Sequence, residues 1–392
     1  MFKALYSDPW VDVFNGNCLD ILSELPAESV QACVTSPPYW GLRRYDGQQD
    51  YIWGNHSGCE HEWLDQSYVR NDDQTAGGKQ KTNAGSVDRD VPIQHHQCLK
   101  CQAWKGAYGL EPAPEMYIEH TVEILRAIKR VLKKDGIVWW NIGDSYAGSG
   151  KAGNNPEYFG KHKEFGKPSS HIERFGLSGI VPKGLKPKDL CLIPFRVAIA
   201  AQQDGWYVRS VVIWSKPNPM PESVKDRPTG SYEYILMLTK SSTYYFDQEA
   251  VKETQKECTT ERYRYGWNGV DDDGSNGART GSAFKKMKQG LSMGEAMGGN
   301  GKRNIRSVWE IATQPYKGAH FATFPEEIPK RCILASTKPS DIVLDPFGGS
   351  GTTGKVAKQL GRRAILIDTS ARYCDMQISR IQAVSIPLEI HV

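Results

Sequence analysis

The sequence contains no long apolar run, because no uncharged stretch approaches the ~18 to 20 residues that a membrane-spanning helix needs. The first residues, MFKALYSDPWVD, lack the basic start and apolar core of a secretory signal peptide. Strong charge of either sign is also absent, since 49 Lys and Arg against 45 Asp and Glu give a net charge of +4. These absences predict a cytoplasmic protein without a membrane partner. They leave a nucleic-acid partner to be judged from the local distribution of charge.

Nine cysteines are an odd number and are mostly scattered, which argues against a disulfide framework. One cluster is different: Cys59-x-His61 and Cys98-x-x-Cys101 supply four soft or borderline metal ligands. This set predicts a structural zinc ion. The 36 residues between the two halves are an unusual spacing, and nearby histidines leave the fourth ligand open: His56, His95 and His96. Free thiols on a loop are the alternative.

Short β-rich runs alternate with helix-length segments along most of the chain, a pattern typical of a mostly parallel sheet with helices on both faces. The strands are expected at 30–35, 136–143, 206–214, 234–239, 342–344 and 363–368, and the helices at 116–134, 193–204, 325–335 and 352–360.

Three stretches interrupt this alternation, at 43–114, 146–188 and 252–306. The first carries the Cys/His cluster. The other two are basic, and 252–306 holds ten glycines with 11 Lys and Arg against 7 Asp and Glu. Basic, glycine-rich loops with aromatic residues can follow a phosphate backbone and stack on bases, although charge alone favours solvated loops.

The segment Asp345-Pro-Phe-Gly-Gly-Ser-Gly-Thr-Thr-Gly354 lies between an expected strand and an expected helix. Glycines at such a turn allow a ligand to approach the bare backbone. The pattern G-x-G-x-x-G is weak evidence by itself, since it also occurs in dinucleotide-binding oxidoreductases. Asp368 ends the next strand, where a carboxylate can accept hydrogen bonds from ribose hydroxyls.

A second motif, Thr35-Ser-Pro-Pro-Tyr-Trp40, follows the strand expected at 30–35. Two consecutive prolines fix the loop and leave carbonyls without competing amide donors. The Ser36 hydroxyl and the Pro37 carbonyl can therefore accept the protons of a nucleobase amine while it attacks an electrophile. Tyr39 can stack on a base that has been turned out of the duplex. The catalytic candidates are Ser36, Pro37, Pro38 and Tyr39.

In this order and at this distance, the two motifs resemble the permuted, beta-class DNA amino-methyltransferases of bacteria and phages, which modify cytosine N4 or adenine N6. The resemblance covers nearly the whole chain. It implies a Rossmann-like α/β methyltransferase fold that binds S-adenosylmethionine, with a seven-stranded, mostly parallel sheet and loop-rich insertions. It also implies cofactor contacts from the glycine turn, from a packing segment upstream and from the ribose acid. These residues are Asp345, Pro346, Phe347, Gly349, Ser350, Gly351, Thr352, Phe324, Pro325 and Asp368. Many relatives carry Gly-Asp where this chain has Gly16-Asn17, which makes Asn17 the candidate near the adenine.

Members of this family whose loop begins with serine mostly modify cytosine N4, whereas an aspartate marks most adenine-N6 enzymes. We therefore expect cytosine N4 as the target, with adenine N6 as the alternative. Cytosine-C5 chemistry needs a thiolate after a proline, and no cysteine here follows one. A non-catalytic, zinc-containing nucleic-acid-binding protein and a dehydrogenase are more distant alternatives.

The resemblance divides the chain into five parts. Residues 1–42 form the catalytic-loop half, 43–114 the insertion with the zinc knuckle, 115–251 the continued core, 252–306 the target-recognition region and 307–392 the cofactor-binding half. Double-stranded DNA is the expected partner. The candidate contacts to DNA are Lys216, Asn218, Lys285, Lys286 and Lys288. The recognition sequence, the oligomeric state and an accompanying, separately acting restriction endonuclease are left open.

Overall fold

The computed structural model describes residues 2–41, 47–54, 58–63, 97–148, 181–182, 184–254, 302–314 and 324–385. The helices in these ranges are α1 (Cys18–Glu24), α2 (Pro114–Val131), α5 (Ile193–Gln203), α9 (Glu327–Ser336), α10 (Thr352–Gln359) and α11 (Ala371–Gln382). The strands are β1 (Tyr6–Ser7), β2 (Val11–Asn15), β3 (Val30–Thr35), β4 (Tyr51–Trp53), β5 (Trp104–Gly106), β6 (Leu132–Ile142), β7 (Tyr207–Ser215), β8 (Tyr232–Thr239), β9 (Glu253–Thr254), β10 (Lys302–Arg303), β11 (Val308–Glu310), β12 (Ile342–Asp345) and β13 (Arg363–Asp368).

One large sheet organises the fold, with the strand order β1-β2-β13-β12-β3-β6-β8-β7-β11. The strands from β2 to β6 pair in parallel, β8 is antiparallel to both of its neighbours, and β11 is parallel to β7. The predicted α/β class with a mostly parallel sheet is confirmed. Within the described residues the sheet has nine strands, two more than the predicted seven. The strands outside the predicted ranges are β1, β2 and β11, whose two, five and three residues are too few to give a hydrophobic pattern.

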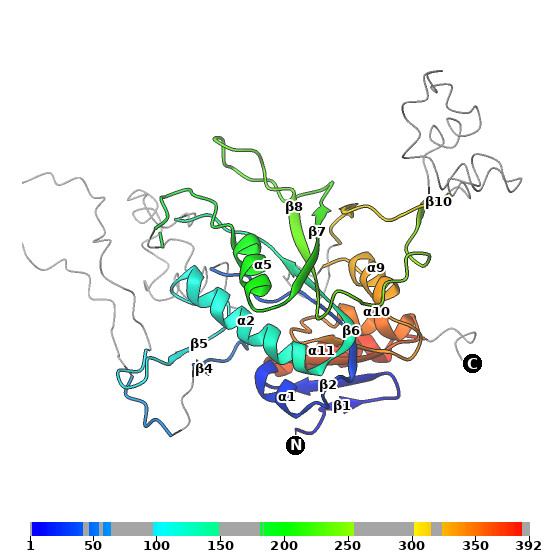
Figure 1. Ribbon diagram of the computed structural model, residues 1–392, viewed down its shortest axis with the longest axis horizontal. Coiled ribbons are helices and arrows are strands. Elements are labelled where there is room, and N and C mark those ends of the chain that lie inside the picture. The colour runs from blue at the N-terminus through cyan, green and yellow to red at the C-terminus, as the bar shows by residue number, and fades with distance from the viewer. Residues whose placement is uncertain are drawn as a thin grey trace, which may run out of the picture.

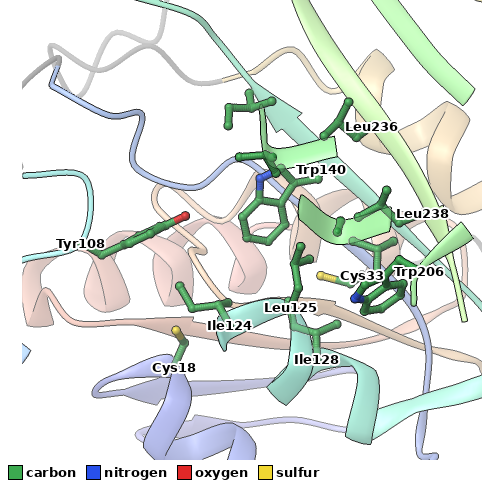
Figure 2. Close-up of a cluster of buried hydrophobic side chains, with 14 of the residues drawn as sticks. Cys18, Cys33, Tyr108, Ile124, Leu125, Ile128, Trp140, Trp206, Leu236 and Leu238 are labelled. Atoms are coloured by element: carbon green, nitrogen blue, oxygen red, sulfur yellow. The ribbon is translucent and has the colours of Figure 1, made fainter. Parts of the chain in front are cut away.

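Helices cover both faces of the sheet (Figure 1). On one face, α1, α2 and α5 bury their apolar side chains against the sheet, and Figure 2 shows the centre of that core, where Ile124, Leu125 and Ile128 of α2 meet Trp140. On the other face, α9, α10 and α11 pack against residues such as Trp139 and Ile137. Neighbouring residues of β6 therefore enter opposite cores, as the alternation of side chains along a strand requires.

The strands β4 and β5 lie outside this sheet and form a separate antiparallel hairpin, in which Tyr51 pairs with Gly106 and Trp53 with Trp104. In Figure 1 the hairpin lies beside α2. Both of its strands come from the insertion predicted at 43–114. Within the described part of the chain, no helix combines the length and apolarity that crossing a bilayer would demand.

Candidate active site

The two predicted motifs meet at one edge of the sheet. Because β3, β6, β12 and β13 are parallel to one another, their carboxyl ends reach the same edge. The loop that begins at Ser36 follows β3, the glycine turn follows Asp345 of β12, and Asp368 ends β13. Strand β8 runs the other way, so its first residues, around Glu233, lie at this edge too.

A chain of hydrogen bonds leads away from Ser36. The Ser36 hydroxyl donates to the Tyr39 hydroxyl over 3.2 Å, and that hydroxyl donates to a carboxylate oxygen of Glu233 over 2.6 Å. The amide nitrogen of Asn141 donates to the Tyr39 oxygen over 2.7 Å and to Ser36 Oγ over 3.3 Å. The catalytic loop is thus connected to a carboxylate through two hydroxyl groups.

Glu233 also forms an ion pair with Lys216. Both side chains are mostly buried, with 17% of Glu233 and 19% of Lys216 exposed, and the Lys216 ammonium lies 4.4 Å from the centre of the Trp214 ring. Sequence reasoning missed Glu233 and Asn141. The only sign in the sequence is that each is a polar residue at the end of a β-rich run, in SYEYILM and VWWNI.

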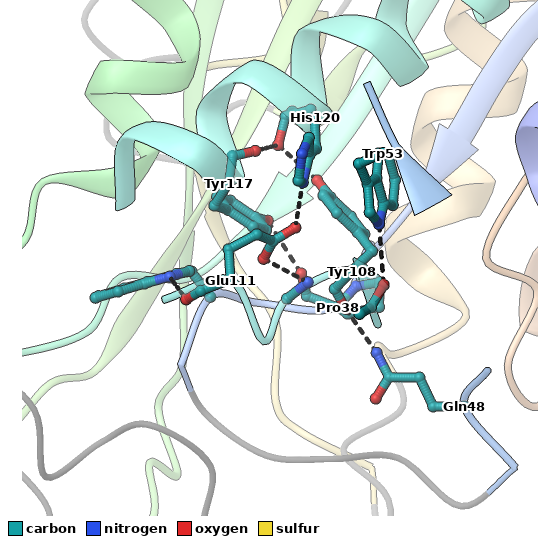
Figure 3. A network of polar contacts seen from close by, with 11 residues as sticks. Pro38, Gln48, Trp53, Tyr108, Glu111, Tyr117 and His120 are labelled. Atoms are coloured by element: carbon teal, nitrogen blue, oxygen red, sulfur yellow. Dashed lines mark hydrogen bonds and ion pairs between the residues drawn. The ribbon is translucent and has the colours of Figure 1, made fainter. Parts of the chain in front are cut away.

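The rest of the catalytic loop is held by α2 and by the segment that precedes it (Figure 3). The Tyr117 hydroxyl donates to the Pro38 carbonyl over 3.0 Å, and the Gly41 amide donates to the Gly109 carbonyl over 2.9 Å. Gly109 has φ +92°, and a Cβ there would lie 2.9 Å from Pro38. These contacts fix the backbone of the loop, and they occupy the Pro38 carbonyl but not that of Pro37.

One pocket connects the catalytic loop with the glycine turn, since Ser36, Pro38, Gly349 and Asp368 all line it. Of the eleven residues predicted to bind the cofactor, eight line the pocket: Asn17, Phe324, Pro346, Phe347, Gly349, Ser350, Thr352 and Asp368. Asp345, Gly351 and Pro325 do not line it. Among the catalytic candidates, Pro37 and Tyr39 lie outside its lining as well.

Asp345 does not line the pocket but connects the two motifs that do. Its two carboxylate oxygens accept hydrogen bonds from Thr35 over 2.6 Å and from Thr353 over 2.7 Å, and its side chain is buried. Burial raises the pKa of this carboxyl to about 6. The bonds connect the last residue of β3 with the first turn of α10, so Asp345 fixes the relative position of the two motifs. Gly351 caps that helix at φ +79°. A Cβ at this position would lie only 3.0 Å from the Gln377 backbone.

Asp368 is the carboxylate that faces the pocket. One of its oxygens accepts a hydrogen bond from the Gly349 amide over 2.8 Å and the other from the Ser370 amide over 2.9 Å. Burial raises the pKa of the carboxyl to about 7. Each oxygen keeps a second lone pair with which it can accept a hydroxyl donor from a ligand.

The insertion contributes to the same pocket, which sequence reasoning did not foresee. Its lining includes five residues of this insertion: Gln48, Gln49, Tyr51, Trp53 and Tyr108. The Tyr108 ring stacks on Phe347 of the glycine turn, with 5.6 Å between the ring centres.

The four predicted metal ligands converge at the end of the β4–β5 hairpin. Their ligand atoms all lie within 4.8 Å of one another, with 3.9 Å between the sulfurs of Cys59 and Cys98 and 3.4 Å between Cys101 Sγ and His61 Nδ1. Ligands at the corners of a zinc tetrahedron stand about 3.5 to 3.8 Å apart, given bonds of about 2.3 Å to sulfur and 2.0 Å to nitrogen. These four ligand atoms could therefore hold one metal ion.

The predicted DNA contacts are placed only in part. Lys216 faces Glu233, and the Asn218 side chain exchanges hydrogen bonds with the backbone of Thr313. Several predicted residues lie outside the described residues: Lys285, Lys286, Lys288, His56, His95 and His96. Most of the stretches 146–188 and 252–306 lies outside them too.

Comparisons with known proteins agree with this arrangement. A family model described as DNA methylase, covering the N6 and N4 enzymes, matches residues 30–379. The Type II methyltransferase M.Cfr9I of Citrobacter freundii is 36% identical over 94% of this chain and 87% of its own length. M.SmaI of Serratia marcescens is 33% identical over 93% of this chain and 89% of its own. A solved structure, the PvuII DNA methyltransferase described as cytosine-N4-specific, superposes with a TM-score of 0.53 over 98% of this chain and 92% of its own, at 17% identity.

Proposed function

The chain belongs to the N6/N4 DNA methylase family, and from this premise we propose that it transfers a methyl group from S-adenosylmethionine to the N4 amine of cytosine in double-stranded DNA. The observation that carries the proposal is the shared pocket. Ser36 of the catalytic loop and Asp368 of the glycine-turn side line one cavity, so a base amine held at Ser36 would face a cofactor held at Asp368.

The cofactor would occupy the part of the pocket between Asn17, the glycine turn and Asp368. Gly349 allows close backbone approach there, and the Asp368 carboxylate is placed to accept the ribose hydroxyls. S-adenosylmethionine supplies an electrophilic methyl group on a positively charged sulfur. The chain itself has to orient the amine, exclude water and take up a proton.

We assign the uptake of that proton to the Ser36-Tyr39-Glu233 chain. As the base nitrogen bonds to the methyl carbon, the bond from that carbon to sulfur would break and S-adenosylhomocysteine would leave. One N–H bond of the amine would break as well, and its proton would pass to Ser36 Oγ. Ser36 passes its own proton to the Tyr39 oxygen, and Tyr39 passes its own to Glu233, whose carboxylate becomes a carboxylic acid. Glu233 is 17% exposed, which gives the proton a path to solvent.

Cytosine is favoured over adenine because the first group to meet the amine is a neutral hydroxyl. Cytosine N4 retains more nucleophilic character than adenine N6, so a serine with a carboxylate two hydrogen bonds away suffices. Adenine N6 is the second candidate, since the matching family includes both amines. Tritium transfer from labelled cofactor to duplex DNA tests the reaction class: we expect incorporation by the wild type and its loss in Ser36→Ala.

We propose that Asp368 binds the cofactor ribose only as a carboxylate, which predicts a pH-dependent affinity. With a pKa of about 7, the carboxyl is protonated at lower pH and then loses acceptor capacity. The dissociation constant should therefore rise as the pH falls from 8 to 6, by up to about tenfold per unit below the pKa. Asp368→Ala should weaken binding by about 1–3 kcal/mol and remove this pH dependence. Calorimetry that finds the same affinity at pH 8 and 6 would contradict the assignment.

We further propose that Cys59, His61, Cys98 and Cys101 bind a structural zinc ion. Four protein ligands close a tetrahedral site and leave no open position for catalysis. The ligands come from two segments separated by 36 residues, so the metal ties together an insertion with little core of its own.

Metal analysis provides the direct test of this site. Protein purified without chelators should contain about one zinc ion per chain, and Cys98→Ser with Cys101→Ser should remove it. Cys332→Ser is a matched control, because Cys332 is a buried residue of α9 in the core of the sheet's other face, away from the cluster. Wild-type protein without zinc would refute the site.

The assignment of 252–306 to target recognition remains a proposal that rests on its basic, glycine-rich sequence. Contact of Lys216 or Asn218 with DNA is likewise a proposal. The Glu233 ion pair and the hydrogen bonds to Thr313 hold both side chains at the catalytic edge, where a flipped base would enter.

A further inference from the structure

The metal ligands and the cofactor pocket share the β4–β5 hairpin. Cys59 and His61 follow β4, and Cys98 and Cys101 precede β5. The two ligand segments are also joined by backbone, since the Leu99 amide donates to the Glu62 carbonyl over 2.9 Å. The metal site therefore lies at the end of the hairpin where β4 stops and β5 starts, and it would join the two strands there.

The strand residues of the same hairpin form a wall of the pocket. Tyr51 and Trp53 of β4 line it, and so does Tyr108, two residues after the end of β5. Only 2% of Trp53 is exposed, so its ring is enclosed rather than lying on a surface. The wall faces the glycine turn, because the Tyr108 ring stacks on the ring of Phe347, which belongs to that turn.

Hydrogen bonds connect this wall to the parts of the chain that would hold the cofactor. The Gln49 side chain donates to the Thr369 carbonyl over 3.3 Å, directly after Asp368. The Tyr51 hydroxyl donates to Asp20 of α1 over 3.2 Å. The hairpin and the residues just before it are thus bonded to α1 and to the loop after Asp368, both of which contribute residues to the pocket lining.

The hairpin is short, so its position depends on what packs against it, and its Trp53 and Trp104 are buried in the core beside α2. Each strand contributes three residues, and an isolated two-stranded hairpin is at best marginally stable. One side is anchored: Trp53 stacks on His120 with 4.2 Å between ring centres, and His120 is bonded to the buried Glu111 over 3.0 Å (Figure 3). The other end is fixed by the Cys/His cluster.

We propose that occupancy of the Cys59, His61, Cys98 and Cys101 site controls the affinity of the cofactor pocket. With the metal bound, Tyr51 and Trp53 are held against the pocket; without it, the end of the hairpin loosens and the wall is lost. This inference rests on the proposed functions of the pocket and of the cluster. It assigns the metal a role in cofactor binding, in addition to stapling the insertion.

Calorimetry with S-adenosylhomocysteine on the full chain tests the coupling. We expect Cys98→Ser with Cys101→Ser to raise the dissociation constant at least tenfold, while Lys105→Ala stays within twofold of wild type. Lys105 is a matched control because it lies on β5 with its side chain exposed, away from both the cluster and the pocket. By linkage, bound S-adenosylhomocysteine should increase the zinc affinity of the wild type by the same factor.

Two further measurements test the coupling even if the double cysteine variant does not fold. Wild-type protein stripped by a chelator should lose cofactor affinity and regain it when zinc returns. Tyr51→Ala should keep its zinc and still bind the ligand more weakly. Equal affinities with and without zinc would overturn the coupling and leave the proposed function intact. A zinc-loaded wild type that binds no ligand would instead overturn the proposed function, and the coupling with it.

Discussion

We expect the Tyr39→Ala variant to turn over about a thousandfold more slowly than wild type, with its affinity for the cofactor within a few-fold. The tyrosine has two roles in the proposed site: its ring stacks on the target base, and its hydroxyl passes a proton from Ser36 to Glu233. Stacking on a base contributes about 1–3 kcal/mol, and positioned proton transfer about 10²–10⁴-fold in rate. Single-turnover methyl transfer and calorimetry measure the two quantities separately.

Tyr39→Phe separates the two roles. Phenylalanine keeps the ring but interrupts the hydrogen-bond chain, so turnover should fall to a level between wild type and Tyr39→Ala. The pocket lining does not include Tyr39, which is why the cofactor affinity should be nearly unchanged. If cofactor affinity and turnover fell by the same factor in Tyr39→Ala, Tyr39 would act on the cofactor and not on the base.

The second large effect is expected for Glu233→Gln, which should slow turnover by about a hundredfold at least. Glutamine can still accept the hydrogen bond from Tyr39, so the loop keeps its position, but it cannot take up a proton at neutral pH. The affinities for cofactor and for DNA should therefore stay close to wild type. This separation distinguishes a proton acceptor from a residue that only supports the loop.

Glu222→Gln is a matched control for this substitution. Glu222 is also paired with a cation, Arg227, but its carboxylate forms no described contact with the catalytic loop. We expect near wild-type turnover from it. Full activity in Glu233→Gln would show that the proton leaves by another path, and the chain from Ser36 would then only fix the geometry of the hydroxyl.

The two motifs were predictable because each is local. Strands β3 and β13 lie at their predicted bounds, since both are mostly apolar segments in a buried parallel sheet. The turn after β12 could be recognised from its glycines, which permit the backbone of Gly351 to adopt φ +79°. Parallel strands then place the ends of β3, β12 and β13 at one edge without further information.

What sequence reasoning missed depends on contacts between distant residues. Glu233 is 194 positions from Tyr39, and no spacing connects the two before β8 is known to run antiparallel beside β6. Strand β2 pairs with β13 across more than 350 residues, and its five residues alone give too short a pattern. The wall formed by Tyr51 and Trp53 depends on where an insertion packs, which its polar sequence does not indicate.

For the Cys/His cluster, by contrast, the sequence already indicated distant residues that the fold brings together. The Cys-x-x-Cys spacing made Cys98 and Cys101 recognisable, and the fold brings Cys59 and His61 to them despite 36 intervening residues. The sequence left the fourth ligand open among several histidines. Among the described residues, the structure places His61 Nδ1 3.4 Å from Cys101 Sγ, which favours His61 for that position.

The most direct test of the proposed function is mass spectrometry of nucleosides from duplex DNA treated with the protein and with cofactor whose methyl group carries a heavy isotope. The Ser36 hydroxyl, connected to Glu233 through Tyr39, predicts that the label appears in N4-methylcytosine and that Ser36→Ala abolishes it. Label found in N6-methyladenine would show that this hydroxyl serves the other amine, and label in neither nucleoside would contradict the proposed reaction.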